Sequence, residues 1–318
     1  MEMPTVSILT PCFNSGDFLR TCLQSVRDQD YPHIEHIVQD AASTDGTAEI
    51  LTEFAEVIDA LSEPDKGQAD GLDRALKRSR GEIILVLNAD DYLLPGAVTW
   101  AVEQLARHPE TACVYGDQMN VDTLGRDLYM TRGPDPYDFA RIFCVEDIIP
   151  AQAAFIRRSA LQAVGFYVDT TLKTCPDYEW WVRLGLQFDC VYEPRLVAAY
   201  RMHPGSETQQ ASMTISMVEA KCSVVTRVCD DPQTPAEVVA LRQRALAGIT
   251  NWGAWSLLGQ RQLRSFLVES WRAYRMSPQV IRLLRLPLGI VEYSLMSWPA
   301  LGRPILQLGH RLRSSLTR

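Results

Sequence analysis

Several sequence patterns that define common binding sites are absent from this chain of 318 residues. The phosphate-binding pattern G-x-x-x-x-G-K-[ST] and the dinucleotide-binding pattern G-x-G-x-x-G do not occur, and the turn T-P-C-F-N has no glycine before Gly16. The eight cysteines form no C-x-x-C pair. A P-loop, a dinucleotide-binding Rossmann domain and a zinc site are therefore disfavoured.

Long apolar runs and a signal peptide are also missing. No window of 18 uncharged apolar residues occurs, so we expect no membrane-spanning helix. We expect reduced, mostly buried thiols in a cytoplasmic protein. The net charge of −8 argues against nucleic-acid binding. This charge is uneven, because residues 261–318 hold ten Arg against two acids, which is +8 and leaves −16 for residues 1–260.

Strand and helix patterns alternate over the first 120 residues, and the apolar positions repeat with the matching periods. A helix is expected after Asp17 as its cap, with Phe18, Leu19 and Leu23 on its apolar face. The expected strands are 6–10, 34–40, 57–61, 82–87 and 111–115, and further helices are 69–78 and 97–107. Repeated βα units predict an α/β fold, a mostly parallel Rossmann-like sheet flanked by helices.

The remainder of the chain is less regular before it becomes helical. Strands are expected at 150–158, 189–192 and 196–200, with helices at 159–164 and 180–186. From residue 212 onward we expect only helices, at 215–228, 236–246, 262–274 and 280–296. The predicted domains are 1–205, with a nucleotide-binding half (1–120) and an acceptor half (121–205), and a helical C-terminal region, 206–318.

Polar residues gather where the expected strands end. The apolar run 83–87 is followed by Asn88, Asp90 and Asp91, and the strand at 34–40 ends on Asp40. Open sheets bind ligands at the carboxyl ends of their strands, and crowded carboxylates repel unless a cation balances them. A strand-end or helix-cap role explains one such pair, but the coincidence of several strand ends favours a nucleotide diphosphate held with a divalent cation, Mg²⁺ or Mn²⁺.

Six segments in order carry a resemblance to a known family. They are TPCFNSGDFLRTCLQSV, VQDAASTDGT, SEPDKGQADGLDRAL, VLNADDYLLPGA, PAQAAFIRRSAL and CPDYEWWVRL. Together, over residues 4 to 203, they resemble the non-processive, bacterial surface-polysaccharide type of family 2 glycosyltransferases. The resemblance implies a GT-A fold, a nucleotide diphosphate-sugar donor, a divalent metal and inversion at the anomeric carbon.

The resemblance also implies roles for individual residues. Asp40 pairs with the nucleobase, Asp90 binds the metal, and His203 completes the metal or diphosphate site unless it is structural. Asp91 is grouped with the metal site, either supporting the ligand or capping the next helix. The remaining residues of the nucleotide and donor site are Thr10, Pro11, Asn14, Asp65, Lys66, Asp70 and Asn88.

The catalytic base implied by the resemblance is Asp177, which begins the segment D-Y-E-W-W. The alternative role of Asp177 is that of a helix cap. Trp180 and Trp181 either stack on a sugar or belong to the core. The chain departs from the family pattern at Ala41-Ala42, where a Gly-containing pair is commoner, and at Gly71 and Asp73, where the family has Ala and Asn. The Q-x-x-R-W motif of processive synthases is absent, so transfer of a single sugar is expected.

The C-terminal residues 276–318 contain an apolar helical stripe opposite arginines. This pattern predicts peripheral contact with the inner face of the cell membrane, or packing against the protein itself or a homodimer partner. The expected activity is transfer of one sugar, most simply from a UDP-sugar, to a glycan or lipid-linked saccharide. The alternatives are transfer to a polyprenyl phosphate and a non-catalytic nucleotide-sugar-binding relative.

Overall fold

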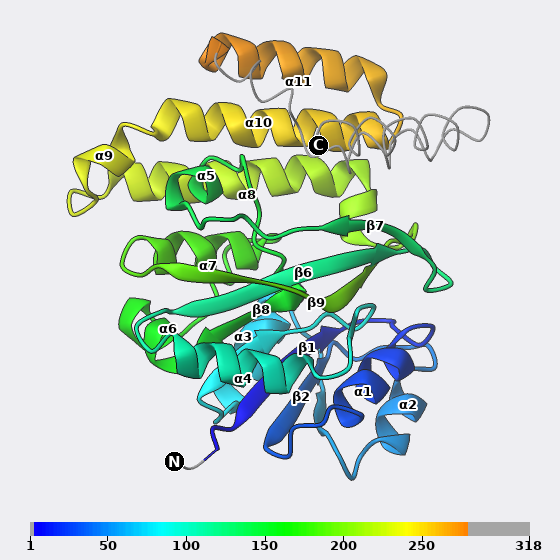
Figure 1. Ribbon diagram of the computed structural model, residues 1–318. Coiled ribbons are helices and arrows are strands. Elements are labelled where there is room, and N and C mark those ends of the chain that lie inside the picture. The colour runs from blue at the N-terminus through cyan, green and yellow to red at the C-terminus, as the bar shows by residue number, and fades with distance from the viewer. Residues whose placement is uncertain (1–2, 279–318) are drawn as a thin grey trace, which may run out of the picture. The chain divides into compact units, whose positions relative to one another are not determined.

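The computed structural model describes residues 3–278, which fall into two compact units (Figure 1). The first comprises residues 3–142 and 147–202, and the second comprises residues 143–146 and 203–278. The helix expected at 280–296 and most of the basic segment 276–318 lie outside the described residues.

The first unit contains a single mixed sheet. Its strands are β1 (Val6–Cys12), β2 (Ile34–Asp40), β3 (Asp59–Ser62), β4 (Ile83–Val86), β5 (Tyr92–Leu93), β6 (Cys113–Val121), β7 (Asp127–Thr131), β8 (Ala154–Arg157) and β9 (Cys190–Arg201). They are ordered β3-β2-β1-β4-β8-β6-β9-β5, and β7 pairs with β6. Strands β3, β2, β1 and β4 are parallel, whereas β8 is antiparallel to both β4 and β6. The predicted α/β class is confirmed, but the parallel arrangement is confined to the N-terminal strands and the β6–β9 pair.

Helices cover both faces of this sheet because side chains of a strand alternate between its faces. Leu9 and Ile84 pack with α3 (Gln68–Arg78), α6 (Arg158–Val164) and α7 (Pro176–Gly185). Ile8 and Leu85 pack with α1 (Leu19–Arg27) and α4 (Ala97–Arg107). The remaining short helices of this unit are α2 (Thr47–Glu53), the 3₁₀ turn Ala151–Ala153, and α5 (Phe139–Phe143), whose last residue belongs to the second unit.

Several predicted boundaries differ from the observed ones. The predicted cap Asp17 is wrong, because α1 begins at Leu19 after Phe18 and has no side-chain cap. The two strands expected at 189–192 and 196–200 form one strand, β9, whose pairing with β6 contains register shifts. The segment 122–132 forms a hairpin in which β7 pairs with β6. The single strand β9 is explained by these register shifts, because a bulged strand keeps its pairing across residues that break the alternating pattern.

The second unit is helical. It contains the 3₁₀ turn Glu207–Gln209, α8 (Ala211–Asp230), α9 (Ala236–Val239), α10 (Arg242–Gly259) and α11 (Leu263–Met276). The helix expected at 236–246 is two helices, because the chain leaves helical hydrogen bonding between α9 and α10. The buried side of α10 is rich in small residues, including Ala247 and Gly248. A Cβ atom at Gly248 would lie 1.9 Å from the carbonyl oxygen of Cys144, so glycine permits this close backbone approach.

Candidate functional site

The carboxyl ends of β1, β2, β3 and β4 lie at the same edge of the sheet, because these strands are parallel. Parallel pairing places Cys12 beside Asp40, and Asp40 beside Ser62. Leu9, within β1, pairs with Val86, the last residue of β4, so Asn88 and Asp90 follow the same edge of the sheet. The convergence expected from the sequence is therefore present in the fold.

Asp40 lies at the end of β2 with only 1% of its surface exposed. Its carboxylate accepts hydrogen bonds from the Ser43 hydroxyl (2.5 Å) and amide (3.1 Å), and from the Ser62 hydroxyl (2.5 Å). These donors hold the carboxylate in one orientation. Nucleobase pairing by Asp40 stays a prediction, and it requires one of the serine hydroxyls to yield its place to a base N–H.

The loop after β1 is tied to the loop after β2. The amide of Asn14 donates to the Ser43 hydroxyl (2.7 Å), and the Asn14 side-chain oxygen accepts from the amide of Thr44 (2.9 Å). Asn14 and Ala42 both adopt positive φ values, 48° and 56°. The Ala41-Ala42 departure thus places an alanine in the left-handed region, which glycine occupies at lower cost.

Thr10 and Pro11 are both buried in β1. The Thr10 hydroxyl lies 2.9 Å from Nε2 of His36, within the sheet. Burial lowers the pKa of His36 to about 3, so this imidazole is neutral. The Thr10 side chain is thus engaged in the core, and its contact with a nucleotide stays a prediction.

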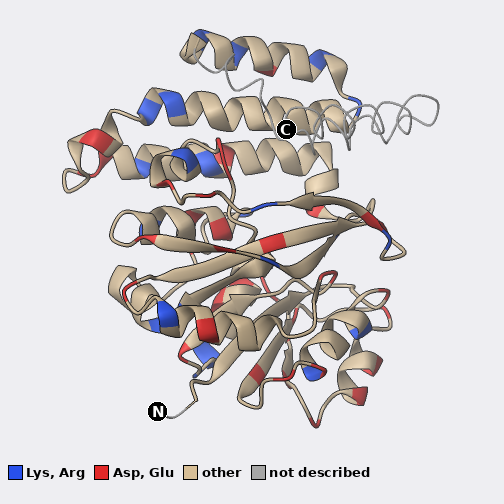
Figure 2. Ribbon diagram, in the orientation of Figure 1, with Lys and Arg blue, Asp and Glu red and all other residues tan. Residues whose placement is uncertain are grey.

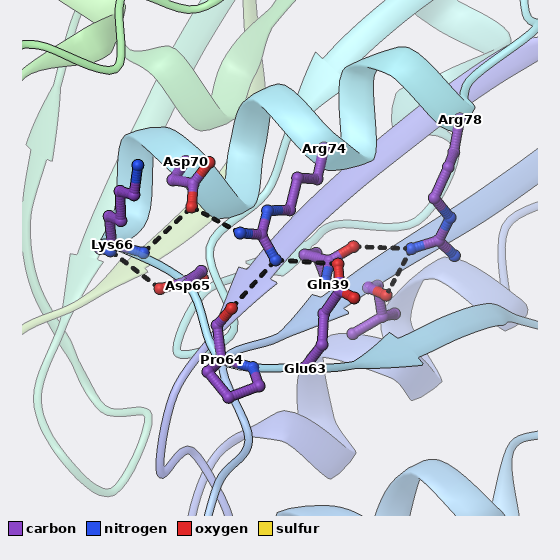
Figure 3. A network of polar contacts seen from close by, with 10 residues as sticks. Gln39, Glu63, Pro64, Asp65, Lys66, Asp70, Arg74 and Arg78 are labelled. Atoms are coloured by element: carbon purple, nitrogen blue, oxygen red, sulfur yellow. Dashed lines mark hydrogen bonds and ion pairs between the residues drawn. The ribbon is translucent and has the colours of Figure 1, made fainter.

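Asp65, Lys66 and Asp70 form the loop and first turn before and within α3. Figure 3 shows this region, where Arg74 joins the Asp70 carboxylate (2.8 Å), the Glu63 carboxylate (2.8 Å) and the Pro64 carbonyl (3.0 Å). The amide of Lys66 donates to Asp70 (3.0 Å), and the Asp65 carboxylate accepts from the amide of Gly67 (2.8 Å). The arginine thus holds the loop on the helix.

Gly71 has a steric role in the same region. A Cβ atom at this position would lie 2.8 Å from Oδ2 of Asp65. An alanine at this position would require the Asp65 carboxylate to move from its observed position. The neighbouring departure, Asp73, is buried, and its carboxylate accepts from the amide of Val168 (3.0 Å) and pairs with Lys77 (2.5 Å).

The turn 88–91 presents two carboxylates in different environments. Asp90 is partly exposed, whereas Asp91 is fully buried. Asp91 accepts hydrogen bonds from the amide of Arg201 (2.8 Å) and from the side chain of Asn88 (3.4 Å). Burial, and after it the charge of Asp90, raise the pKa of Asp91 well above its ordinary value.

These contacts separate the roles of the two carboxylates. The predicted alternative that Asp91 caps the next helix is wrong, because α4 begins at Ala97, after β5, with Gly96 as its N-cap. Asp91 instead joins the turn to β9. Asp90 is the more exposed of the two carboxylates, and its role as a metal ligand stays a prediction. Asn88 replaces the first acid of the D-x-D pattern. Its side-chain oxygen accepts a hydrogen bond from the side-chain amide of Gln68 (3.1 Å).

Arg201, at the end of β9, holds the turn 88–91 in place, and the sequence did not identify this residue. Its Nε donates to the carbonyl oxygen of Asp90 (3.0 Å), and Nη1 donates to that of Thr123 (3.1 Å). Its guanidinium lies over the rings of Phe18 (5.0 Å) and Tyr92 (5.5 Å). The only sequence signal is its place two residues before His203 in the segment Y-R-M-H-P.

Within residues 3–278, no group of three or more His, Cys, Asp or Glu side chains is arranged to hold a metal ion. Mg²⁺ and Mn²⁺ are commonly held by one or two carboxylates together with the phosphates of a substrate. The partly exposed Asp90 fits that kind of site. His203 belongs to the second unit, and its role as a metal ligand stays a prediction.

Asp177 occupies the second position of α7, which begins at Pro176 after Cys175. The N-cap position belongs to Cys175, so the alternative role of Asp177 as the N-cap residue is wrong. The Asp177 side chain is exposed, whereas Glu179 is buried and pairs with Arg183 (2.6 Å). Of the two acids, only Asp177 is accessible to an acceptor from solvent.

Trp180 and Trp181 both belong to the hydrophobic core below α7. Trp180 is 2% exposed, and its indole N–H donates to the carbonyl of Tyr167 (3.0 Å). Trp181 is 5% exposed. Both therefore fill the core, which was one of the two predicted roles, and neither presents a ring face for sugar stacking.

No helix within residues 3–278 is long and apolar enough to cross a membrane.

Residues 7–165 match the profile of the family described as Glycosyl transferase family 2. An uncharacterized glycosyltransferase of Mycobacterium tuberculosis is 32% identical over 186 residues, which covers 58% of this chain and 70% of that protein. A Bacillus subtilis protein, TuaG, named as a glycosyltransferase of teichuronic acid biosynthesis, is 36% identical over 92 residues, 28% of this chain and 36% of its own.

Two solved structures have the same fold. Residues 1–349 of TarS from S. aureus, in complex with UDP-GlcNAc, align with a TM-score of 0.62 and 17% identity over 92% of this chain and 90% of that one. The mannosyltransferase PcManGT from Pyrobaculum calidifontis, in complex with GDP-Man and Mn²⁺, aligns with a TM-score of 0.58 and 18% identity over 94% and 89%. At these identities the likeness concerns the fold.

Proposed function

Because this chain belongs to glycosyltransferase family 2 and has the GT-A fold, we propose that it transfers a single sugar, with inversion, from a UDP-sugar to a hydroxyl group. The proposed acceptor is a glycan or a lipid-linked saccharide of cell-surface polysaccharide synthesis. TuaG, named for teichuronic acid biosynthesis, supports the polysaccharide context, and the UDP-GlcNAc complex of TarS supports the donor class.

The observation that carries this proposal is the alignment of parallel strand ends in the first unit. Asp40 is the last residue of β2, and Asn88 and Asp90 follow β4, on either side of β1. This arrangement offers acceptor oxygens for a nucleoside and a partly exposed carboxylate for a cation. A divalent cation there would balance the charge of the departing diphosphate. The Mn²⁺ in the PcManGT complex supports that choice of cofactor.

Cation binding and proton transfer in this proposed reaction are assigned to different residues. Asp90 would hold the cation together with the donor phosphates, and Arg201 and Asp91 fix the turn that presents Asp90. Asp177 would accept the proton of the acceptor hydroxyl while that oxygen bonds to the anomeric carbon and the bond to the diphosphate breaks. The products are the glycosylated acceptor, the nucleoside diphosphate and a protonated Asp177, which returns its proton to water.

The donor is tested by thermal unfolding with UDP-, GDP- and dTDP-sugars, each with Mn²⁺ and with EDTA. A ligand at a hundredfold excess over its dissociation constant stabilises the folded state by roughly 2.7 kcal/mol. We expect this stabilisation for UDP-sugars with Mn²⁺ only. A larger effect of GDP- or dTDP-sugars would contradict the donor assignment.

Catalysis and stereochemistry need a second readout. We expect metal-dependent hydrolysis of the donor, with the released sugar inverted when its anomeric configuration is followed by NMR before mutarotation. Retention of configuration would exclude the single-displacement mechanism. Binding without any turnover, with and without acceptors, would identify a nucleotide-sugar-binding relative in place of an enzyme.

A further inference from the structure

Helix α11 of the second unit presents an unusual outward face. Its inner side is buried at Ala273, and the ring of Phe266 meets Trp255 of α10 edge to face, with centroids 5.2 Å apart. Large apolar side chains on its other side are exposed, which are Leu263 (59%), Leu267 (59%), Val268 (57%) and Trp271 (62%). Exposed groups of this kind mark surfaces that contact something other than water.

The charged residues of this face all have one sign. Arg264, Arg272 and Arg275 are exposed on α11, and the helical period of 3.6 residues places Arg264 and Arg275 on the same side as Trp271. The one acid of α11, Glu269, lies off that side, partly exposed, and pairs with Arg272 at 3.6 Å. In Figure 2, blue bands of Lys and Arg recur along α11, which is otherwise mostly tan.

We propose that this face of α11 binds an anionic lipid surface. Tryptophan and leucine side chains can enter the boundary between headgroups and acyl chains, and arginines can extend along them to lipid phosphates. Each arginine near a negatively charged leaflet adds attraction. The membrane contact predicted from the sequence lay in residues 276–318, whereas this surface precedes that segment and is formed by described residues.

Charge argues against two other occupants. A two-fold contact between copies of this chain would place two copies of the same positively charged face against each other, because both subunits use the same patch. Residues 279–318 contain six arginines and one acid, Glu292, so this segment also has the sign of charge that the face repels. A surface with negative charge is the complementary partner.

The inference depends on the surface of the second unit and is independent of the proposed sugar transfer. It is tested with the full chain by sedimentation with phosphatidylcholine vesicles, with and without phosphatidylglycerol, at low and high salt. We expect binding that requires the anionic lipid and weakens with salt. Arg264→Gln and Arg275→Gln should each weaken partitioning about fivefold, and Trp271→Ala roughly tenfold.

Matched controls lie on other helices of the same unit. Ile215→Ala removes an exposed apolar side chain of α8, and Arg242→Gln removes an arginine of α10 that pairs with Asp230 (2.6 Å). Both should bind vesicles as the wild type does. Brominated lipids should quench the fluorescence of the wild type more than that of Trp271→Phe, because only the wild type inserts this indole.

Three results would overturn the proposal. The first is equal vesicle binding by the wild type and the α11 variants, which would place any membrane contact elsewhere. The second is equal binding to neutral and anionic vesicles, or none to either. The third is conversion of a dimer to a monomer by Trp271→Ala in analytical ultracentrifugation, which would assign the face to a second copy of the chain. UDP-dependent thermal stabilisation should be unchanged in all variants.

Discussion

The strand-end site of the first unit and the helical second unit use polar side chains in opposite ways. Asp40 and Asp91 are buried, and each accepts hydrogen bonds from residues of neighbouring loops or strands. In α11, by contrast, Arg264 and Arg275 extend from an exposed face that also carries Trp271. The inner side of α10 is packed through alanine and glycine.

This difference separates two kinds of constraint. A buried carboxylate with several donors keeps a fixed position, and fixed positions are what ligand binding and catalysis require. Small residues between helices constrain only the packing distance, so their replacement affects stability and leaves ligand chemistry unchanged. Substitutions in the first unit should therefore change binding and rate, and those within α10 should change stability.

The largest expected effect is that of Asp177→Asn. The substitution keeps the size of the side chain and its place at the start of α7 but removes the proposed base. We expect sugar transfer to fall by roughly 10²–10⁴-fold, with folding and UDP affinity unchanged. Steady-state transfer rates and calorimetric UDP titration measure the two quantities.

Glu179→Gln is the control for this substitution. It breaks the buried contact with Arg183 (2.6 Å), so we expect lower thermal stability and a nearly normal rate for the folded enzyme. If Asp177→Asn transfers sugar at the wild-type rate, or loses UDP binding together with stability, the base lies elsewhere.

The second effect is that of Asp90→Ala on metal-dependent UDP binding. Removal of the proposed cation ligand should abolish the difference in UDP affinity between Mn²⁺ and EDTA, which we expect to be on the order of 100-fold in the wild type. Asp127→Ala, at the exposed start of β7, is the matched control. Equal UDP affinity of the wild type in Mn²⁺ and EDTA would rule out the metal site.

The third effect tests helix packing in the second unit. Gly248→Ala places a methyl group 1.9 Å from the backbone of Cys144, which cannot move easily, so we expect a loss of about 1–3 kcal/mol of stability. UDP affinity of the folded protein should not change. Gly253→Ala meets only the side chain of Val218 and should cost less, as denaturant unfolding would measure. Equal stability of both variants would show that the contact at Gly248 relaxes freely.

The fourth effect is that of Arg201→Lys. Lysine keeps the charge but cannot reach the carbonyls of Asp90 and Thr123 with the geometry of a guanidinium. We expect roughly tenfold weaker Mn²⁺-dependent UDP binding, with little change in the affinity measured in EDTA. Weakening by the same factor in Mn²⁺ and in EDTA would show that Arg201 acts on the fold and not on the turn that carries Asp90.

The last expected effect concerns acid stability and leaves the behaviour near neutral pH unchanged. His36 has a pKa of about 3 in the folded protein, lowered by burial, and an ordinary value near 6.5 when unfolded. The unfolded state therefore binds more protons below pH 6.5, and stability falls as the pH decreases from there toward 3, by at most about 1.4 kcal/mol per pH unit. His36→Gln should flatten this slope in denaturant titrations at several pH values. An unchanged slope would assign the acid sensitivity to other groups.

The sequence predicted the layers of the first unit because they depend on local periodicity. The alternation of Ile8 and Leu9 between the two faces of β1, and the buried face of α1 at Leu19 and Leu23, follow directly from the strand and helix periods. Helix α4 was predicted with its observed bounds, 97–107. The polar residues after β2 and β4 also follow from the point at which each apolar run stops.

Tertiary structure decided which of those polar residues the protein itself occupies. Asp91 is engaged by Arg201, 110 residues later, and Asp40 by Ser62, 22 residues later, and both contacts depend on strand pairing that no local pattern encodes. The burial of Trp180 and Trp181 was equally open, because a helix with apolar residues on several sides gives no single inner face. Sequence periodicity thus determined where the strands end, whereas the non-local register of β3, β5 and β9 determined which side chains at those ends remain accessible, since hydrogen-bond partners are set by spatial neighbours and not by sequence neighbours.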